Sequence, residues 1–125
     1  AARFGAEVVP SGQPMHGRSS SVFHDGHPVF DQIPSPFTGG RYHSLIIDPA
    51  SLPDSLSVIA RAQDGTIMAI AHRDLPIIGY QFHPESVLTP EGYPLLRNFL
   101  RLAGLDLPQQ KFKLSPPTQT RLSTA

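Results

Sequence analysis

Residues 75–86 of the chain read Leu-Pro-Ile-Ile-Gly-Tyr-Gln-Phe-His-Pro-Glu-Ser. The nearly continuous apolar run over residues 75–82 predicts a buried strand of an α/β sheet. His83 and Glu85 follow directly at the carboxyl end of that strand, which is where such sheets bind ligands. The stretch therefore predicts both the fold class and the place of a site.

His83 and Glu85 are two residues apart, a spacing at which side chains of an extended segment point the same way. The Glu85 carboxylate can then contact one ring nitrogen of His83 while the other faces a cleft. A carboxylate so placed stabilises the imidazolium that forms when the ring takes a proton from a thiol or hydroxyl. The pair is a candidate base and orienting acid of a catalytic triad. His-x-Glu alone is more often a surface pair, and the chain has no cysteine.

A helix is predicted after this motif. Thr89 is a candidate N-cap, Pro90 suits the first helical position, and Glu91 faces the positive end of the helix dipole. Gly104 is a natural terminator. Between them, apolar residues recur with helical spacing at Leu95, Leu96, Phe99, Leu100 and Ala103.

Shorter strands separated by turns are predicted for the rest of the chain. Asp64-Gly65 is a strong hairpin signal between two of these strands. Antiparallel strands beside a mainly parallel sheet make an α/β domain with a mixed edge. Pro, Gln, Ser and Thr dominate residues 105–125, for which we expect a disordered tail or a linker. The strands are expected at residues 20–24, 41–47, 56–62 and 66–72.

Composition restricts the class of protein. A formal net charge of +0 argues against a nucleic-acid partner held by phosphate contacts. No apolar run approaches the roughly 18 residues of a membrane-spanning helix, and no signal peptide is evident at the first residues. His24 and His27 span a turn without a cluster of further ligands, so no metal site is predicted. We expect a globular protein with neither a nucleic-acid nor a membrane partner.

Three segments resemble one protein family. Residues 79–86, with the residues that follow them, resemble the last motif of class I glutamine amidotransferases. Two further segments resemble the glutaminase subunits that serve anthranilate synthase and aminodeoxychorismate synthase. The resemblance covers residues 1–104. Its motifs are Gly79-Tyr80-Gln81-Phe82-His83-Pro84-Glu85-Ser86 with Leu88-Thr89, Gly92 and Asn98-Phe99-Leu100, then Met15-His16-Gly17-Arg18 with Ser20, and Arg41-Tyr42-His43-Ser44-Leu45.

The resemblance implies a flavodoxin-like α/β sheet flanked by helices. Residues 1–104 would be the C-terminal half of that domain, with a mixed or antiparallel edge. His83 and Glu85 would be catalytic, and the backbone of Ser44 and Leu45 would bind glutamine. The family's nucleophile is a Cys in the motif Gly-x-Cys-x-Gly-His-Gln, preceded by a Gly-rich loop. Neither is in this sequence, so we expect the chain to be an incomplete copy that is inactive alone.

The implied reaction is the hydrolysis of glutamine through a thioester, with no cofactor. The ammonia passes to a chorismate-using synthase subunit in a heteromeric complex, and the location is cytoplasmic. The anthranilate branch of tryptophan biosynthesis is favoured over the aminodeoxychorismate branch of folate biosynthesis. A non-catalytic half-domain that serves only as a docking surface is the alternative. We favour the enzyme, because the residues of the site keep their catalytic pattern.

Overall fold

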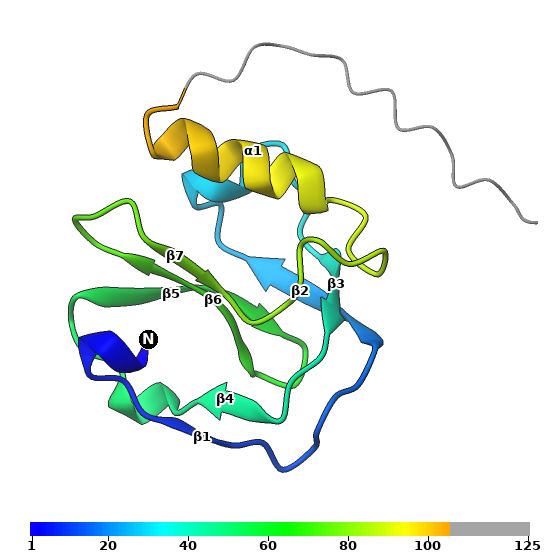
Figure 1. Cartoon of the computed structure of the whole chain (residues 1–125), viewed down its shortest axis with the longest axis vertical. Coiled ribbons are helices and arrows are strands. Elements are labelled where there is room, and N and C mark those ends of the chain that lie inside the picture. The colour runs from blue at the N-terminus through cyan, green and yellow to red at the C-terminus, as the bar shows by residue number, and fades with distance from the viewer. Residues whose placement is uncertain (106–125) are drawn as a thin grey trace, which may run out of the picture.

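The structure, a computed structural model, describes residues 1–105 and contains two antiparallel sheets beneath a helix (Figure 1). The tail expected over residues 105–125 lies outside the described residues except for its first position. Among residues 1–105, no helix has the length and apolar character needed to cross a membrane.

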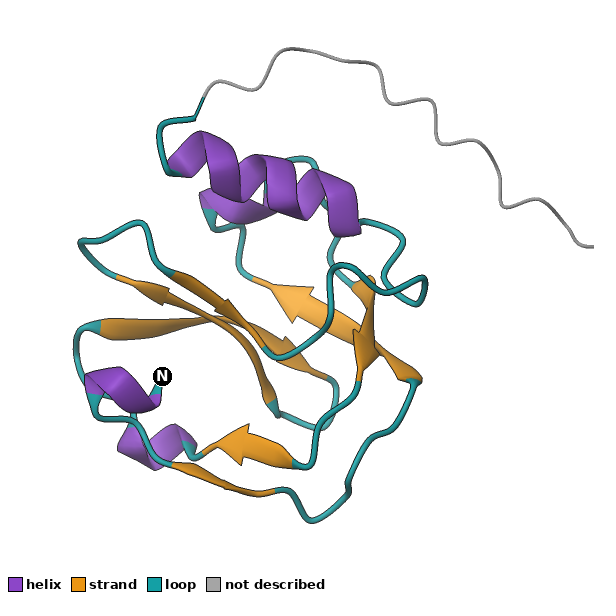
Figure 2. Cartoon of the chain, viewed as in Figure 1, coloured by secondary structure: helices purple, strands orange, loops and turns teal. Residues whose placement is uncertain are grey.

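The larger sheet has five strands in the order β3-β2-β5-β6-β7, and all neighbouring strands are antiparallel. The smaller sheet pairs β1 with β4, also antiparallel. Figure 2 shows α1 and η2 together on one face of the larger sheet. The strands are β1 (Val8–Pro10), β2 (Arg18–His24), β3 (Phe37–Arg41), β4 (Leu45–Ile47), β5 (Leu56–Ala62), β6 (Ile67–His72) and β7 (Ile78–Tyr80). The helices are α1 (Gly92–Leu102) and the 3₁₀ turns η1 (Ala2–Phe4), η2 (Pro28–Phe30) and η3 (Pro49–Ser51).

The predicted hairpin is confirmed in β5 and β6. Gly65 has a φ of 88°, a left-handed conformation that favours glycine. The Asp64 carboxylate accepts the backbone N–H of Thr66 at 3.0 Å, which closes the turn from the other side. This element depends on neighbouring residues only, which is why a local sequence signal found it.

The prediction of one strand over residues 41–47 is wrong, because this stretch contains the end of one strand and the whole of another, in two different sheets. β3 ends at Arg41 in the larger sheet, and β4 begins at Leu45 in the smaller one. Residues 42–44 cross between them. His43 fixes the crossover, since its Nδ1 contacts the carbonyl oxygen of Leu45 at 3.1 Å. The local pattern is strand-like throughout, so only the long-range partners reveal the break.

The buried strand expected over residues 75–82 is much shorter. β7 covers Ile78–Tyr80 and is half-buried, as the last strand of the larger sheet. Leu75 and Ile77 lie in the preceding turn and are 51% and 39% exposed. The turn forms because Nδ1 of His72 accepts the backbone N–H groups of Asp74 and Leu75. A histidine at the end of β6 therefore competes with extension of the strand.

The helix starts later than predicted. α1 begins at Gly92, with Glu91 as an N-cap that makes no side-chain capping bond, so the N-cap role expected of Thr89 is wrong. The predicted end is confirmed, because Gly104 has a φ of 81° and its N–H bonds to the carbonyl of Arg101. The next N–H, that of Leu105, bonds to the Leu100 carbonyl, which completes a Schellman motif.

The main core lies between the larger sheet and α1. Leu95 of α1 is fully buried, together with Val29 of η2 and Phe82, the residue before His83. Asn98 is buried on the same side, and its amide donates to the carbonyl oxygens of Val29 and Asp31 at 2.8 and 2.9 Å. The amide thus attaches α1 to the loop around η2 and satisfies buried acceptors.

Candidate active site

His83 and Glu85 contact each other, although across a turn and not along the extended segment that was expected. Nδ1 of His83 lies 2.6 Å from Oε1 of Glu85, and the two side chains are 41% and 68% exposed. Hydrogen bonds from its own backbone N–H and from the His83 ring hold the pKa of the Glu85 carboxyl below its ordinary value. The carboxylate therefore stays ionised and accepts the Nδ1 proton. Nε2 is then the ring nitrogen left to take up a proton from a nucleophile.

The backbone of His83 is held against β3. Its N–H donates to the carbonyl of Gly40 at 2.9 Å. Its own carbonyl accepts the hydroxyl of Thr89 at 2.7 Å and the N–H of Ser86 at 3.1 Å. Thr89 is buried, and its hydroxyl serves this loop instead of capping α1. The loop after β7 is therefore fixed by a strand far from it in sequence.

Tyr42 is a member of the site that sequence reasoning missed. Its ring lies edge-on to the His83 ring, with the centroids 5.1 Å apart and an interplanar angle of 72°. Its hydroxyl is 3.1 Å from Oγ of Ser86. The tyrosine therefore packs directly against the candidate base. The available signal was its position in the segment that resembles a glutamine-binding element.

Ser44 is the last residue of the crossover that begins at Tyr42, and Leu45 is the first residue of β4. Both residues are exposed, and their carbonyl oxygens contact the N–H of Ser11 and Nδ1 of His43 respectively. The segment before β2 supports them, because the N–H of Ser11 donates to the Ser44 carbonyl and the N–H of Met15 donates to the His43 carbonyl, both at 2.8 Å. The structure thus connects the predicted substrate segment to His83 through the intervening Tyr42.

A buried polar pair supports the crossover from within. Nε of Arg41 donates to Nε2 of His43 at 2.9 Å, so the His43 ring carries its proton on Nδ1. Burial lowers the pKa of the His43 imidazole, and the adjacent Arg41 charge lowers it further. Arg41 is 3% exposed and is paired with Asp64 at 3.4 Å. The crossover is therefore anchored by a neutral histidine.

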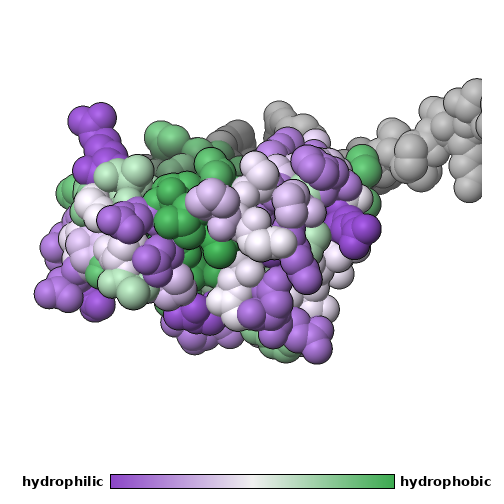
Figure 3. All heavy atoms as spheres, turned by 90° about the horizontal axis from the view of Figure 1, so that it is seen from below, coloured by the Kyte–Doolittle hydropathy of each residue, from purple (hydrophilic) through white to green (hydrophobic). Residues whose placement is uncertain are grey.

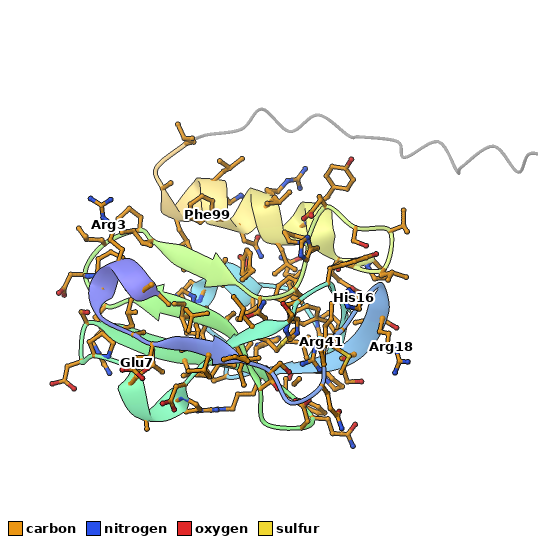
Figure 4. All side chains as sticks on the ribbon, turned by 60° about the horizontal axis from the view of Figure 1, so that its bottom comes forward. Arg3, Glu7, His16, Arg18, Arg41 and Phe99 are labelled. Atoms are coloured by element: carbon orange, nitrogen blue, oxygen red, sulfur yellow. The ribbon has the colours of Figure 1, made fainter. Side chains whose placement is uncertain are left out.

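Figure 4 shows where the labelled residues around Arg41 lie. His16, Arg18 and Arg41 lie toward one end of the domain, whereas Arg3 and Glu7 lie toward the opposite one. The segment of His16 therefore lies on the side of Arg41, and the N–H of Met15 joins this segment to His43.

The histidines considered as metal ligands are engaged locally. Nδ1 of His24 accepts the N–H of Gly26, and Nδ1 of His27 accepts that of Val29. Nε2 of His24 contacts the carbonyl oxygen of Ile33 at 2.9 Å. Within the described part of the chain, no three His, Cys, Asp or Glu side chains gather as a metal site would require. These residues act as turn and capping groups.

The family assignment follows from comparison with known proteins. A sequence model of the family described as "Glutamine amidotransferase class-I" matches residues 1–103. The chain belongs to the class I glutamine amidotransferases. The recognition of this family from the three motifs is thereby confirmed.

Relatives of this amidotransferase chain come from both chorismate branches. Anthranilate synthase component 2 of Methanothermobacter marburgensis is 53% identical over 95 residues, covering 76% of this chain and 48% of the relative. Aminodeoxychorismate synthase component 2 of Klebsiella aerogenes is 50% identical over 97 residues, covering 78% and 52%. The chain spans about half the length of the curated relatives that it matches most strongly.

A solved structure confirms the fold class. A Thermoplasma acidophilum protein assigned to the GMP synthases superposes with a TM-score of 0.75 at 30% identity. The match covers 83% of this chain and 51% of that one. The antiparallel strands described above are therefore part of the α/β amidotransferase fold.

Proposed function

We propose that the chain carries the base, the orienting acid and the glutamine-binding segment of a glutaminase component. That component hydrolyses glutamine and delivers ammonia to a chorismate-using synthase subunit. The 2.6 Å contact between His83 and Glu85 carries the proposal, because it is the geometry of a general base with its orienting carboxylate. The exposure of Ser44 and Leu45, which follow Tyr42 closely along the chain, supports it.

The nucleophile must come from another segment or chain, since this sequence has no cysteine. His83 takes the thiol proton on Nε2, and the thiolate attacks the side-chain carbonyl carbon of glutamine. His83 then donates that proton to the departing ammonia, which leaves a thioester that water hydrolyses. Ionised Glu85 stabilises the imidazolium between the two transfers. The reaction needs no cofactor.

The β7 edge supports a complementary segment on the far side of the site. β7 pairs with β6 and is the last strand of the larger sheet among residues 1–105. A cavity of about 120 Å³ beside it is lined mainly by apolar residues of β4, β6 and β7. Figure 3 shows apolar side chains gathered in a hollow of the face seen there. An additional strand that runs parallel to β7 at this edge would bring its own carboxyl end next to His83.

The synthase that we favour is that of the anthranilate branch of tryptophan biosynthesis. The aminodeoxychorismate branch of folate biosynthesis is the alternative, and one relative of Bacillus subtilis, 48% identical, is named for both.

A joined protein tests the proposal. The full chain is fused to the half of the Methanothermobacter marburgensis component 2 that it does not cover, and ammonia release from glutamine is measured. We expect activity that rises on addition of a synthase component, more with the anthranilate enzyme than with the aminodeoxychorismate enzyme. Ser44→Trp should raise the KM for glutamine more than it lowers kcat. A soluble, folded fusion without glutaminase activity contradicts the proposal.

The absence of cysteine also favours a second candidate, a docking module without catalysis. In that case the unfused chain binds a synthase component, and the fusion does not hydrolyse glutamine. Measuring binding and ammonia release on the same samples separates the two functions.

A further inference from the structure

Thr89 closes a ring of hydrogen bonds between β3 and the loop that carries His83. The N–H of His83 donates to the Gly40 carbonyl at 2.9 Å. The His83 carbonyl accepts the Thr89 hydroxyl at 2.7 Å, and that hydroxyl oxygen accepts the Gly40 N–H at 2.8 Å. The N–H and the carbonyl of both Gly40 and His83 are therefore hydrogen-bonded. One N–H and one carbonyl bond to each other directly, and the other two bond to the Thr89 hydroxyl.

This arrangement is a widened antiparallel bridge. In an ordinary hydrogen-bonded pair, two residues exchange both N–H···O bonds. Here Gly40 and His83 exchange one bond, and the threonine hydroxyl is inserted into the other. Thr89 is 4% exposed, so without its hydroxyl the buried Gly40 N–H would lose its partner, and the His83 carbonyl would keep only the N–H of Ser86.

Packing allows little freedom around this bridge. A Cβ added at Gly40 would lie 3.0 Å from Cβ of Leu88 and 3.2 Å from Oγ of Ser86. Ser86 in turn accepts the N–H of Leu88 and contacts the Tyr42 hydroxyl, both at 3.1 Å. The loop therefore lies flush against β3 just before the crossover begins.

The local sequence makes the use of Thr89 informative. Threonine before a helix ordinarily caps it. α1 instead begins at Gly92 without a side-chain cap, while the threonine hydroxyl faces His83. When a residue departs from its local preference in this way, a non-local interaction has determined its position, and such departures are expected at functional sites.

We propose that Thr89 is a positioning residue of the glutaminase reaction, which fixes His83 against the end of β3. Because β3 continues into the crossover with Ser44 and Leu45, the bridge sets the place of the base relative to bound glutamine. The inference rests on the proposed function. Thr89 would affect the reaction only by holding His83 in place.

The test uses the fused protein described above. Thr89→Val keeps the shape and removes the hydroxyl, whereas Thr89→Ser keeps the oxygen. Thr38→Val, at an exposed position of β3, is the matched control. For each variant, circular dichroism checks folding, kcat and KM are measured with glutamine, and the hydrogen exchange of the Gly40 amide is followed by NMR.

Since a 1 Å misplacement can cost about a hundredfold in rate, we expect Thr89→Val to lower kcat by about tenfold or more. KM should change by less than about threefold, because the substrate segment is retained. The Gly40 amide should exchange faster. Thr89→Ser and Thr38→Val should keep kcat within about threefold of the unchanged protein, by the same reasoning.

Two results would overturn the inference. One is a folded Thr89→Val protein with unchanged kcat or unchanged Gly40 exchange. The other is a folded Thr89→Ser protein whose kcat falls by about tenfold or more, as expected of Thr89→Val. This second result tests the role of the hydroxyl even if the valine variant does not fold. His83→Ala tests the proposed function separately. If His83 is not the base, this variant leaves the activity of the fusion unchanged.

Discussion

Gly92→Ala should damage both the fold and the site, although it lies in α1. A Cβ at this position would lie 1.8 Å from the carbonyl oxygen of Pro84, the residue between His83 and Glu85. Real Cβ atoms essentially never come within 3.0 Å of another heavy atom, so the Pro84 carbonyl or α1 must move by about 1.2 Å. The substitution therefore transmits a shift directly to the base and its orienting acid.

The sign is opposite to that of helix propensity. Alanine in place of glycine inside a helix ordinarily stabilises by about 0.8–1 kcal/mol. Here overpacking should destabilise by about 1–3 kcal/mol. For a domain of the size of the fused protein, this lowers Tm by about 2–4 °C per kcal/mol. A displacement of this size should also lower kcat by about a hundredfold.

Urea unfolding of the fused protein and the kcat for glutamine measure both effects. Gly12→Ala is the matched control, because a Cβ there meets nothing within 4 Å, and its effect should stay within about 0.5 kcal/mol. Greater stability of Gly92→Ala with unchanged kcat would refute the steric argument.

Three further predictions concern the fold. Asn98→Ala should lower the free energy of unfolding by about 2–4 kcal/mol, because the carbonyls of Val29 and Asp31 lose their donor. Arg97→Ala, at an exposed position of the same helix, should lower it by less than about 0.5 kcal/mol in the same urea titrations. Since burial and Arg41 hold the pKa of His43 below its unfolded value, the unfolded state binds more protons, and the stability from neutral His43 is lost as pH falls through the folded pKa. His43→Gln should flatten the loss of stability on acidification from about pH 7 to pH 5, and an unchanged slope would exclude this cause. The unfused chain should aggregate or melt broadly in light scattering and calorimetry, because β7 is an edge strand without a second neighbour among residues 1–105; a sharply melting monodisperse monomer would count against this.

Elements that depend on neighbouring residues could be predicted from the sequence. The Asp64-Gly65 hairpin and the helix end at Gly104 each follow from a local rule, and the structure contains both. The contact between His83 and Glu85 is likewise local, but it is made across a turn that the Ser86 N–H closes onto the His83 carbonyl, not along the extended segment expected from the sequence. These features required no knowledge of the rest of the chain.

Features that depend on distant partners could not be predicted in the same way. The break between β3 and β4 exists because each strand pairs with a different neighbour. Thr89 looked like a helix cap, yet its hydroxyl bonds to Gly40, which is 49 positions away. Tyr42 lines the site through contacts with His83 and Ser86 that no local pattern indicates.

The central claim is that His83 is the base of a glutaminase, and ammonia release by the fused protein tests it most directly. Glutamine hydrolysis is compared between the unchanged fusion, His83→Ala and Glu85→Gln. We predict that His83→Ala lowers kcat by about a thousandfold or more, and that Glu85→Gln retains a larger residue of activity, because the orienting group contributes less than the base. A folded fusion that hydrolyses glutamine at the same rate with and without the His83 imidazole would contradict the account.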